Sequence, residues 1–222
     1  MSWILQNQPN RYTPCERKGL NKRLPDRKKP SSPEVDLLSR PQLLSVIAAT
    51  ALILLLVAKV WLHFDPVQLP FMLSWKAIGI GAGLGFSISV VSVAAYWLWP
   101  AYRRSTDFYL NFVLAPLVLA DSIWIGLLPG MSEELLFRGV MLPSIGLNGV
   151  GLLVSSFCFG MLHMSSKDQW PYAVWASLIG LILGGSVLIT GNLLVPVTAH
   201  ILTNFVSSLF WQLKRESSSA ST

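Results

Sequence analysis

The sequence predicts an all-α, polytopic membrane protein: a helix bundle of about six transmembrane helices preceded by a disordered basic N-terminal arm. Of the 222 residues, 52% are hydrophobic and only 13% are charged, whereas a soluble domain carries about a quarter charged residues. The apolar residues occur in stretches long enough to cross a bilayer, which takes about 20 residues per helix. Nine of the 17 basic residues precede the first of these stretches.

The first 42 residues are polar and basic, and they are interrupted by prolines at positions 9, 14, 25, 30, 33 and 41. They contain too little apolar surface to offset the entropy of ordering, so residues 1–42 are predicted to form a disordered cytoplasmic arm. A basic segment beside a membrane is typical of orientation and of attraction to anionic lipid. No base-reading module accompanies the charge, which argues against nucleic acid as a partner. The serine-rich end, residues 214–222, is predicted to be a polar tail.

Six apolar stretches are predicted to span the membrane, at residues 43–63, 75–99, 112–141, 149–165, 171–190 and 193–213. We divide them into N-terminal transmembrane helices (43–111) and a C-terminal transmembrane core (112–213). The third stretch is too long for one straight span and contains Pro116 and Pro129, which can break or kink a helix. It is therefore either one tilted, kinked helix or a span followed by a second one.

Charge distribution favours six spans. With that number, the arm, the Arg103-Arg104 loop, Lys167 and Lys214-Arg215 share one side, which collects 14 of the 17 basic residues. Splitting the third stretch into two spans would separate these groups. Because an excess of Lys and Arg marks the cytoplasmic side, we expect a multi-pass protein with both termini in the cytoplasm.

Several spans also carry glycines at a spacing of four, which lets helix backbones approach closely in lipid. These pairs are Gly79 with Gly83, Gly81 with Gly85, and Gly180 with Gly184. The surrounding GIGAGLG run lies inside an apolar span and lacks the strand-turn-helix setting of a nucleotide loop, so helix packing is the predicted role.

The segment from Met131 to Gly139 places two carboxylates and a guanidinium in an otherwise apolar helix. Charges at that depth are costly and usually face a cavity, which makes them a functional hypothesis. Glu134 and Arg138 are four residues apart with the acid first, the favourable order for an ion pair on one helix face. Glu133 projects about 100° away from Glu134 and is not explained by that pair.

Two further spans contribute imidazoles. His163 ends the fourth span, one turn after Phe159, and His200 lies four residues before Asn204 on one face of the last span. Taken singly, His163 is more often a packing or boundary residue, and the last pair could be an interhelical hydrogen bond. The combination is more informative. At about 1.5 Å per residue, Glu133, His163 and His200 all fall within the hydrocarbon layer and can converge near its middle.

At these residues the sequence resembles the CAAX protease and bacteriocin-processing family of intramembrane proteases, also called the Abi family. That family has the motifs EExxxR, FxxxH, and His followed four residues later by Asn or a similar residue. Here they are Glu133-Glu134-Leu-Leu-Phe-Arg138, Phe159-Gly-Met-Leu-His163 and His200-Ile-Leu-Thr-Asn204. The resemblance covers about residues 115–213, and all three motifs occur in order on successive spans.

The resemblance implies an endopeptidase that hydrolyses a peptide bond of a membrane-associated protein or peptide within a cavity open to water. It implies that Glu133 and His163 activate the water, and that His200 and Asn204 bind or polarise the scissile carbonyl. Glu134, Arg138 and Phe159 would support these four. A preorganised donor at an oxyanion is worth about 3–4 kcal/mol.

The resemblance leaves the cofactor open. Glu133, His163 and His200 form a legitimate ligand set for zinc or another divalent metal, and the family is commonly labelled as metalloproteases. The same groups also suit a metal-free, glutamate-activated water, and the usual HExxH signature is absent.

Two other functions fit the same residues. The chain could be a non-proteolytic membrane scaffold or partner-binding protein on the same fold, or a small transporter with a proton relay. No inverted repeat is visible between the two halves, which disfavours the transporter. A scaffold has no physical need for Glu133 beside an already paired Glu134. The substrate stays open among a prenylated CAAX-type target, a bacteriocin-like peptide and a resident membrane protein.

Overall fold

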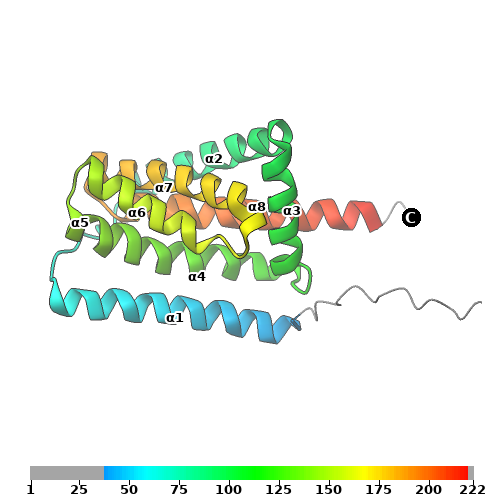
Figure 1. Ribbon diagram of the computed structural model, residues 1–222, viewed down its shortest axis with the longest axis horizontal. Helices are drawn as coiled ribbons and strands as arrows, with labels where there is room; N and C mark the ends of the chain where they lie inside the picture. Colours follow the sequence, from blue (N-terminus) through cyan, green and yellow to red (C-terminus); the bar gives the residue numbers. More distant parts are fainter. Residues whose placement is uncertain (1–37, 220–222) are drawn as a thin grey trace, which may run out of the picture. The chain divides into compact units, whose positions relative to one another are not determined.

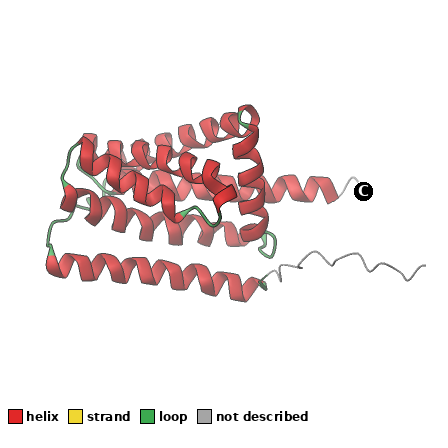
Figure 2. Ribbon diagram, viewed as in Figure 1, coloured by secondary structure: helices red, strands yellow, loops and turns green. Residues whose placement is uncertain are grey.

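The computed structural model describes residues 38–219, with side chains described as far as Glu216, and these residues form helices joined by short loops. The elements are α1 (Arg40–Phe64), α2 (Trp75–Leu98), α3 (Pro100–Leu114), η1 (Leu119–Asp121), α4 (Ser122–Glu134), η2 (Leu135–Met141), α5 (Leu142–Ile145), α6 (Gly149–Leu162), η3 (Lys167–Gln169), α7 (Trp170–Thr190) and α8 (Leu194–Ser219). No strand occurs within this part of the chain (Figure 2). The all-α fold class is confirmed.

The long helices run side by side, and α3 stands across one end of them (Figure 1). Helix α8 lies at the centre, in contact with α2, α4, α7 and α3, while α6 packs along α7. Helix α1 lies at the edge of the bundle, where it packs on α4 and on the π-helical segment η2. The last motif therefore lies on the central helix α8, and the second lies on α6, which packs along α7.

Four helical segments are long and apolar enough to cross a membrane, and a fifth is added if the bent pair of α3 with the α4 to α5 run counts as one span. Six spans were expected. The difference lies mainly in α6, an apolar helix of 14 residues, which at about 1.5 Å per residue reaches only about 21 Å. Asn148 caps its first turn by accepting hydrogen bonds from the N–H groups of Val150 and Gly151, and His163 ends it.

The third predicted span is wrong in its bounds. A span over residues 112–141 was expected, with Pro116 and Pro129 as potential breaks, but α3 ends at Leu114 and the axis turns by 104° before the segment Leu119–Ile145. Pro116 lies at the turn, and its missing N–H and bulky ring oppose continuation of a helix. Pro129 lies inside α4 without ending it. Beyond α4 the helix continues as the π-helical turn η2, a form frequent at functional sites.

Both predicted tails differ from the structure where they are described. Residues 1–37 of the expected arm lie outside the described residues, and α1 begins at Arg40 rather than at residue 43. The expected tail at 214–222 is helical as far as Ser219, because α8 continues past the apolar stretch.

A bidentate ion pair joins the first turn of α1 to the start of α4. The Nε of Arg40 lies 2.8 Å from Oδ2 of Asp121, and its terminal nitrogen lies 2.8 Å from Oδ1. Asp121 also accepts a hydrogen bond from the N–H of Val118 at 2.9 Å. Asp121 is thus committed to holding α1 against α4.

The glycines of α2 fall into two groups. A Cβ at Gly85 would lie 2.6 Å from the carbonyl oxygen of Ala199, and Gly81 is equally close to α8. Gly79 and Gly83 have nothing within 4 Å of such a Cβ. One of the two predicted glycine faces is therefore the contact between α2 and α8, and it lies next to His200.

Gly85→Ala is expected to push α2 away from α8, since the added methyl meets backbone atoms. Overpacking of this kind costs about 1–3 kcal/mol, which would lower the melting temperature of the purified protein in detergent. Gly83→Ala, on the same helix, should leave it unchanged. Equal melting temperatures for the two variants would contradict this account of the α2–α8 contact.

Candidate active site

A cavity of about 330 Å³ lies between α1, α3, α4, α6, α7 and α8. Its wall on the α1 side is mostly apolar, with Val46, Ile47, Ala51 and Leu54. Its other side is polar, because Glu133, His163, His200 and Asn204 all line it. The structure therefore brings the four predicted catalytic residues, which come from three separate motifs, to one cavity.

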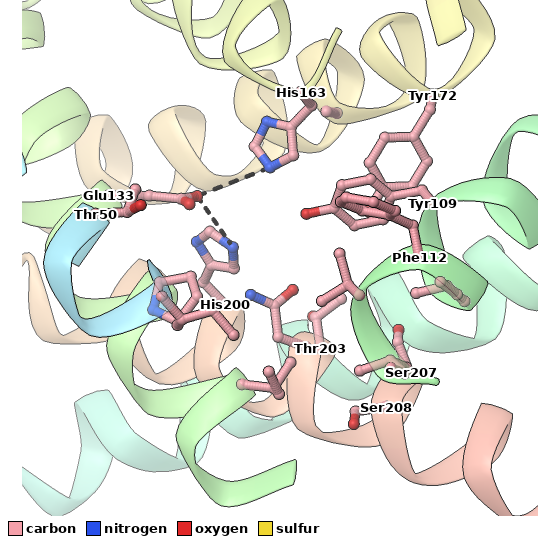
Figure 3. Close-up of a pocket in the computed structure, with 18 of the residues that line it drawn as sticks. Thr50, Tyr109, Phe112, Glu133, His163, Tyr172, His200, Thr203, Ser207 and Ser208 are labelled. Atoms are coloured by element: carbon pink, nitrogen blue, oxygen red, sulfur yellow. Dashed lines mark ion pairs between the residues drawn. The ribbon is translucent and has the colours of Figure 1, made fainter. Parts of the chain in front are cut away.

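Glu133 lies close to both histidines of the site. Its Oε2 lies 3.9 Å from Nε2 of His163 and 3.8 Å from Nε2 of His200 (Figure 3). The Glu133 side chain is 15% exposed, and its Oε2 is buried with no hydrogen-bond partner among the described residues. A buried carboxylate oxygen is normally hydrogen-bonded, so this oxygen is available for a molecule that enters the cavity.

Glu134 points away from the cavity into the protein, as its position 100° around the helix requires. Its Oε1 accepts a hydrogen bond from Arg138 at 2.6 Å, and both side chains are completely buried. The predicted ion pair is confirmed. Oε1 also lies 2.8 Å from Nδ1 of His200, a contact that the sequence did not predict.

The contact to Glu134 determines which nitrogen of His200 carries the proton. Because Glu134 is held ionised by Arg138, it can only accept, so Nδ1 of His200 must donate. Nδ1 of His163 lies 2.9 Å from the carbonyl oxygen of Phe159, which likewise only accepts. In their neutral forms, both imidazoles therefore present an unprotonated Nε2 toward Glu133.

Arg138 is held on three sides. Besides Glu134, it donates to the carbonyl oxygen of Gly180 at 3.0 Å, and its guanidinium lies 4.3 Å from the ring centroid of Phe159. A Cβ at Gly180 would lie 3.1 Å from the guanidinium. The close approach of α7 to the motif therefore favours glycine at this position. A buried guanidinium needs such partners, since an unpaired buried charge is strongly destabilising.

Phe159 joins the two imidazoles and the guanidinium. Its ring centroid lies 4.8 Å from that of His163 and 5.6 Å from that of His200, the latter edge to face. It also packs edge to face on Phe137 at 5.4 Å. Only 2% of Phe159 is exposed, so this ring fixes the position of both histidines. The supporting position predicted for Phe159 agrees with these contacts.

Asn204 lines the cavity one helical turn after His200, and its side-chain amide makes no hydrogen bond to any described residue. Sequence analysis also missed Tyr109 of α3 and Tyr172 of α7, which are among the further polar residues that line the cavity. Tyr109 lies just before the third predicted span, and helical spacing gives no indication that it faces this cavity.

The chemistry of the donor set suits zinc in kind, since one carboxylate oxygen and two imidazole nitrogens face one another. Among residues 38–219, however, no group of three or more His, Cys, Asp or Glu side chains is arranged so that it could hold a metal ion. Metal binding by Glu133, His163 and His200 therefore stays a prediction.

Comparison with known proteins agrees with the motifs. Residues 115–206 match the Rce1-like family, described as type II CAAX prenyl endopeptidase Rce1-like. The match contains all three motifs, so the resemblance to CAAX-type proteases is confirmed for this part of the chain, and it indicates an endopeptidase. The apolar helices and the family together indicate an integral membrane protein.

The chain is also similar to a protein of Bacillus subtilis (strain 168), the uncharacterized protein YpbD. The two are 27% identical over 142 residues, which is 64% of this chain and 72% of that protein. No solved structure gives a significant match.

Glu134→Gln should reduce the stability of the protein much more than Glu133→Gln. It leaves the buried charge of Arg138 without a counter-ion, which costs about 3–5 kcal/mol, whereas Glu133 makes no ion pair at hydrogen-bonding distance. Two quantities are measured after detergent extraction: the amount of monodisperse protein in size-exclusion chromatography and the melting temperature of that protein. Similar losses for both variants would show that the two carboxylates share one structural role.

Proposed function

We propose that this protein is an intramembrane endopeptidase that cleaves a peptide bond of a membrane-associated protein or peptide. The observation that carries the proposal is the unpartnered, buried Oε2 of Glu133, which lies within 4 Å of the Nε2 atoms of His163 and His200. A carboxylate placed between two imidazoles in a cavity is suited to hold a water molecule and take its proton. The match to the CAAX-type family supports the same reaction class.

In the proposed mechanism, a water molecule donates one hydrogen bond to Glu133 and the other to Nε2 of His163. Glu133 takes the first proton as the water oxygen attacks the carbonyl carbon of the substrate. The tetrahedral intermediate then collapses, the C–N bond breaks, and Glu133 returns the proton to the leaving nitrogen. In these steps Glu133 acts first as a base and then as an acid, and the proton taken from water ends on the leaving nitrogen.

His200 has a more limited role than the resemblance implies. Its Nδ1–H is committed to Glu134, so its Nε2 can donate to the oxyanion only when the imidazole is protonated. Among the predicted catalytic residues, Asn204 is the one whose uncharged side chain can donate to the oxyanion.

Water reaches this site from the side of the α6–α7 connection. His163 caps the C-terminal end of α6, and the following residues from Met164 to Asp168 are exposed. The apolar wall formed by α1 is suited to a hydrophobic segment of the substrate. A prenylated CAAX-type target, a bacteriocin-like peptide and a resident membrane protein all present such a segment.

Glu133→Gln, His163→Ala and His200→Ala are each expected to abolish processing while the protein still inserts into the membrane. The measurement is a quantitative comparison of membrane-protein termini between cells that express the wild type and cells that express Glu133→Gln. It identifies the substrate at the same time, as the protein whose new terminus disappears. Asp168→Asn makes the same chemical change at an exposed carboxylate and should leave the termini unchanged.

A protease role would be excluded if no terminus depended on Glu133 although all variants were present at wild-type levels. Full complementation of a deletion strain by the same variants would favour a scaffold that binds a partner.

If a metal is required, the purified wild type should contain about one equivalent of zinc or another divalent ion, and His163→Ala should lose it. Elemental analysis of detergent-purified protein gives this ratio. Metal content that is equal in both proteins, together with activity that survives chelation, would favour the metal-free mechanism.

A further inference from the structure

An aromatic wall closes the cavity opposite Glu133. Tyr109 of α3 stacks on Tyr172 of α7, with ring centroids 4.5 Å apart and planes inclined by 25°. Tyr172 also lies near His163, with ring centroids 6.0 Å apart. The chain turns near Pro116, after the end of α3, so that α3 stands across one end of the bundle. In this position Tyr109 lines the cavity.

The hydroxyl of Tyr109 is not used inside the protein. Tyr109 lines the cavity together with Glu133, His200 and Asn204, and its hydroxyl has no hydrogen-bond partner among the described residues. Tyr96 is different, since its hydroxyl donates to Asp107 at 2.7 Å and accepts from Lys214 at 3.2 Å. A tyrosine hydroxyl in a mostly buried position usually has a partner, so the free hydroxyl of Tyr109 suits a molecule that occupies the cavity.

The proposed reaction needs a second hydrogen-bond donor for the oxyanion, and the hydroxyl of Tyr109 can supply it. A developing oxyanion is best stabilised by two preorganised donors, but neutral His200 presents an unprotonated Nε2 and leaves Asn204 as the donor. Figure 3 shows Tyr109 projecting into the cavity on the side opposite Glu133, beyond the two imidazoles. A substrate carbonyl whose carbon faces a water on Glu133 would direct its oxygen toward this side.

We propose that Tyr109 is a second oxyanion donor, which hydrogen-bonds the carbonyl oxygen of the scissile peptide bond as it becomes negatively charged. This inference rests on the proposed endopeptidase function and adds a catalytic residue to it. The hydroxyl keeps its proton throughout the reaction, and Glu133 handles the proton transfer. Tyr172 packs between Tyr109 and His163 and serves to position the Tyr109 ring.

The test uses Tyr109→Phe in the full chain. The substrate is the one whose terminus depends on Glu133, reconstituted with the enzyme in phosphatidylcholine vesicles. Removal of one oxyanion donor lowers the cleavage rate by about 100- to 1000-fold, with KM nearly unchanged, because the hydrogen bond strengthens in the transition state. The phenylalanine ring preserves the stacking on Tyr172, so the melting temperature should not change.

Tyr96→Phe is the matched control, because it removes a hydroxyl that lies outside the catalytic cavity and should leave cleavage near the wild-type rate. Wild-type kcat in Tyr109→Phe, with Glu133→Gln inactive in the same vesicles, would overturn the role of Tyr109 and leave the protease function intact. A rise in KM at constant kcat would also overturn it, since it indicates a contact to the bound substrate alone. If Glu133→Gln cleaved like the wild type, the proposed function itself would be wrong.

Discussion

The geometry of the site depends on the buried ion pair between Glu134 and Arg138. Both side chains are fully buried, and burying two charges in a protein interior is costly unless their partners are well placed. The partners come from other parts of the chain: the carbonyl of Gly180 on α7, the ring of Phe159 on α6 and Nδ1 of His200 on α8. Because each of these groups satisfies the pair, the pair in turn holds α6, α7 and α8 in register around α4.

This arrangement separates the work of two adjacent carboxylates. Glu134 is bound through its Oε1 to both Arg138 and His200, while Glu133 lines the cavity and makes no hydrogen bond to a described residue. The hydrogen bond from His200 to Glu134 and that from His163 to Phe159 turn both Nε2 atoms toward Glu133. Glu134 therefore determines which nitrogen of His200 carries the proton, and the other nitrogen of that ring faces the preceding residue, Glu133.

The cavity has a polar side and an apolar wall, a division suited to cleavage of a hydrophobic, membrane-associated substrate by water. Helix α1 supplies much of the apolar wall and is fastened at its first turn by Arg40 and Asp121. Helix α3 supplies Tyr109 on the opposite side. Neither helix carries a residue of the three motifs, yet both shape the space in which the motifs meet, which links the N-terminal half of the chain to the chemistry.

The sequence by itself determined the helical membrane class, the ion pair between Glu134 and Arg138, and the residues that line the polar side of the cavity. These features are local or compositional: an apolar stretch predicts a span, and residues four apart share a helix face. The tertiary structure alone decided the contact of Glu134 with His200 and the presence of Tyr109 in the cavity. Each of these depends on the packing of segments far apart in the chain, as Glu134 and His200 are, and helical periodicity carries no information about which distant faces will meet.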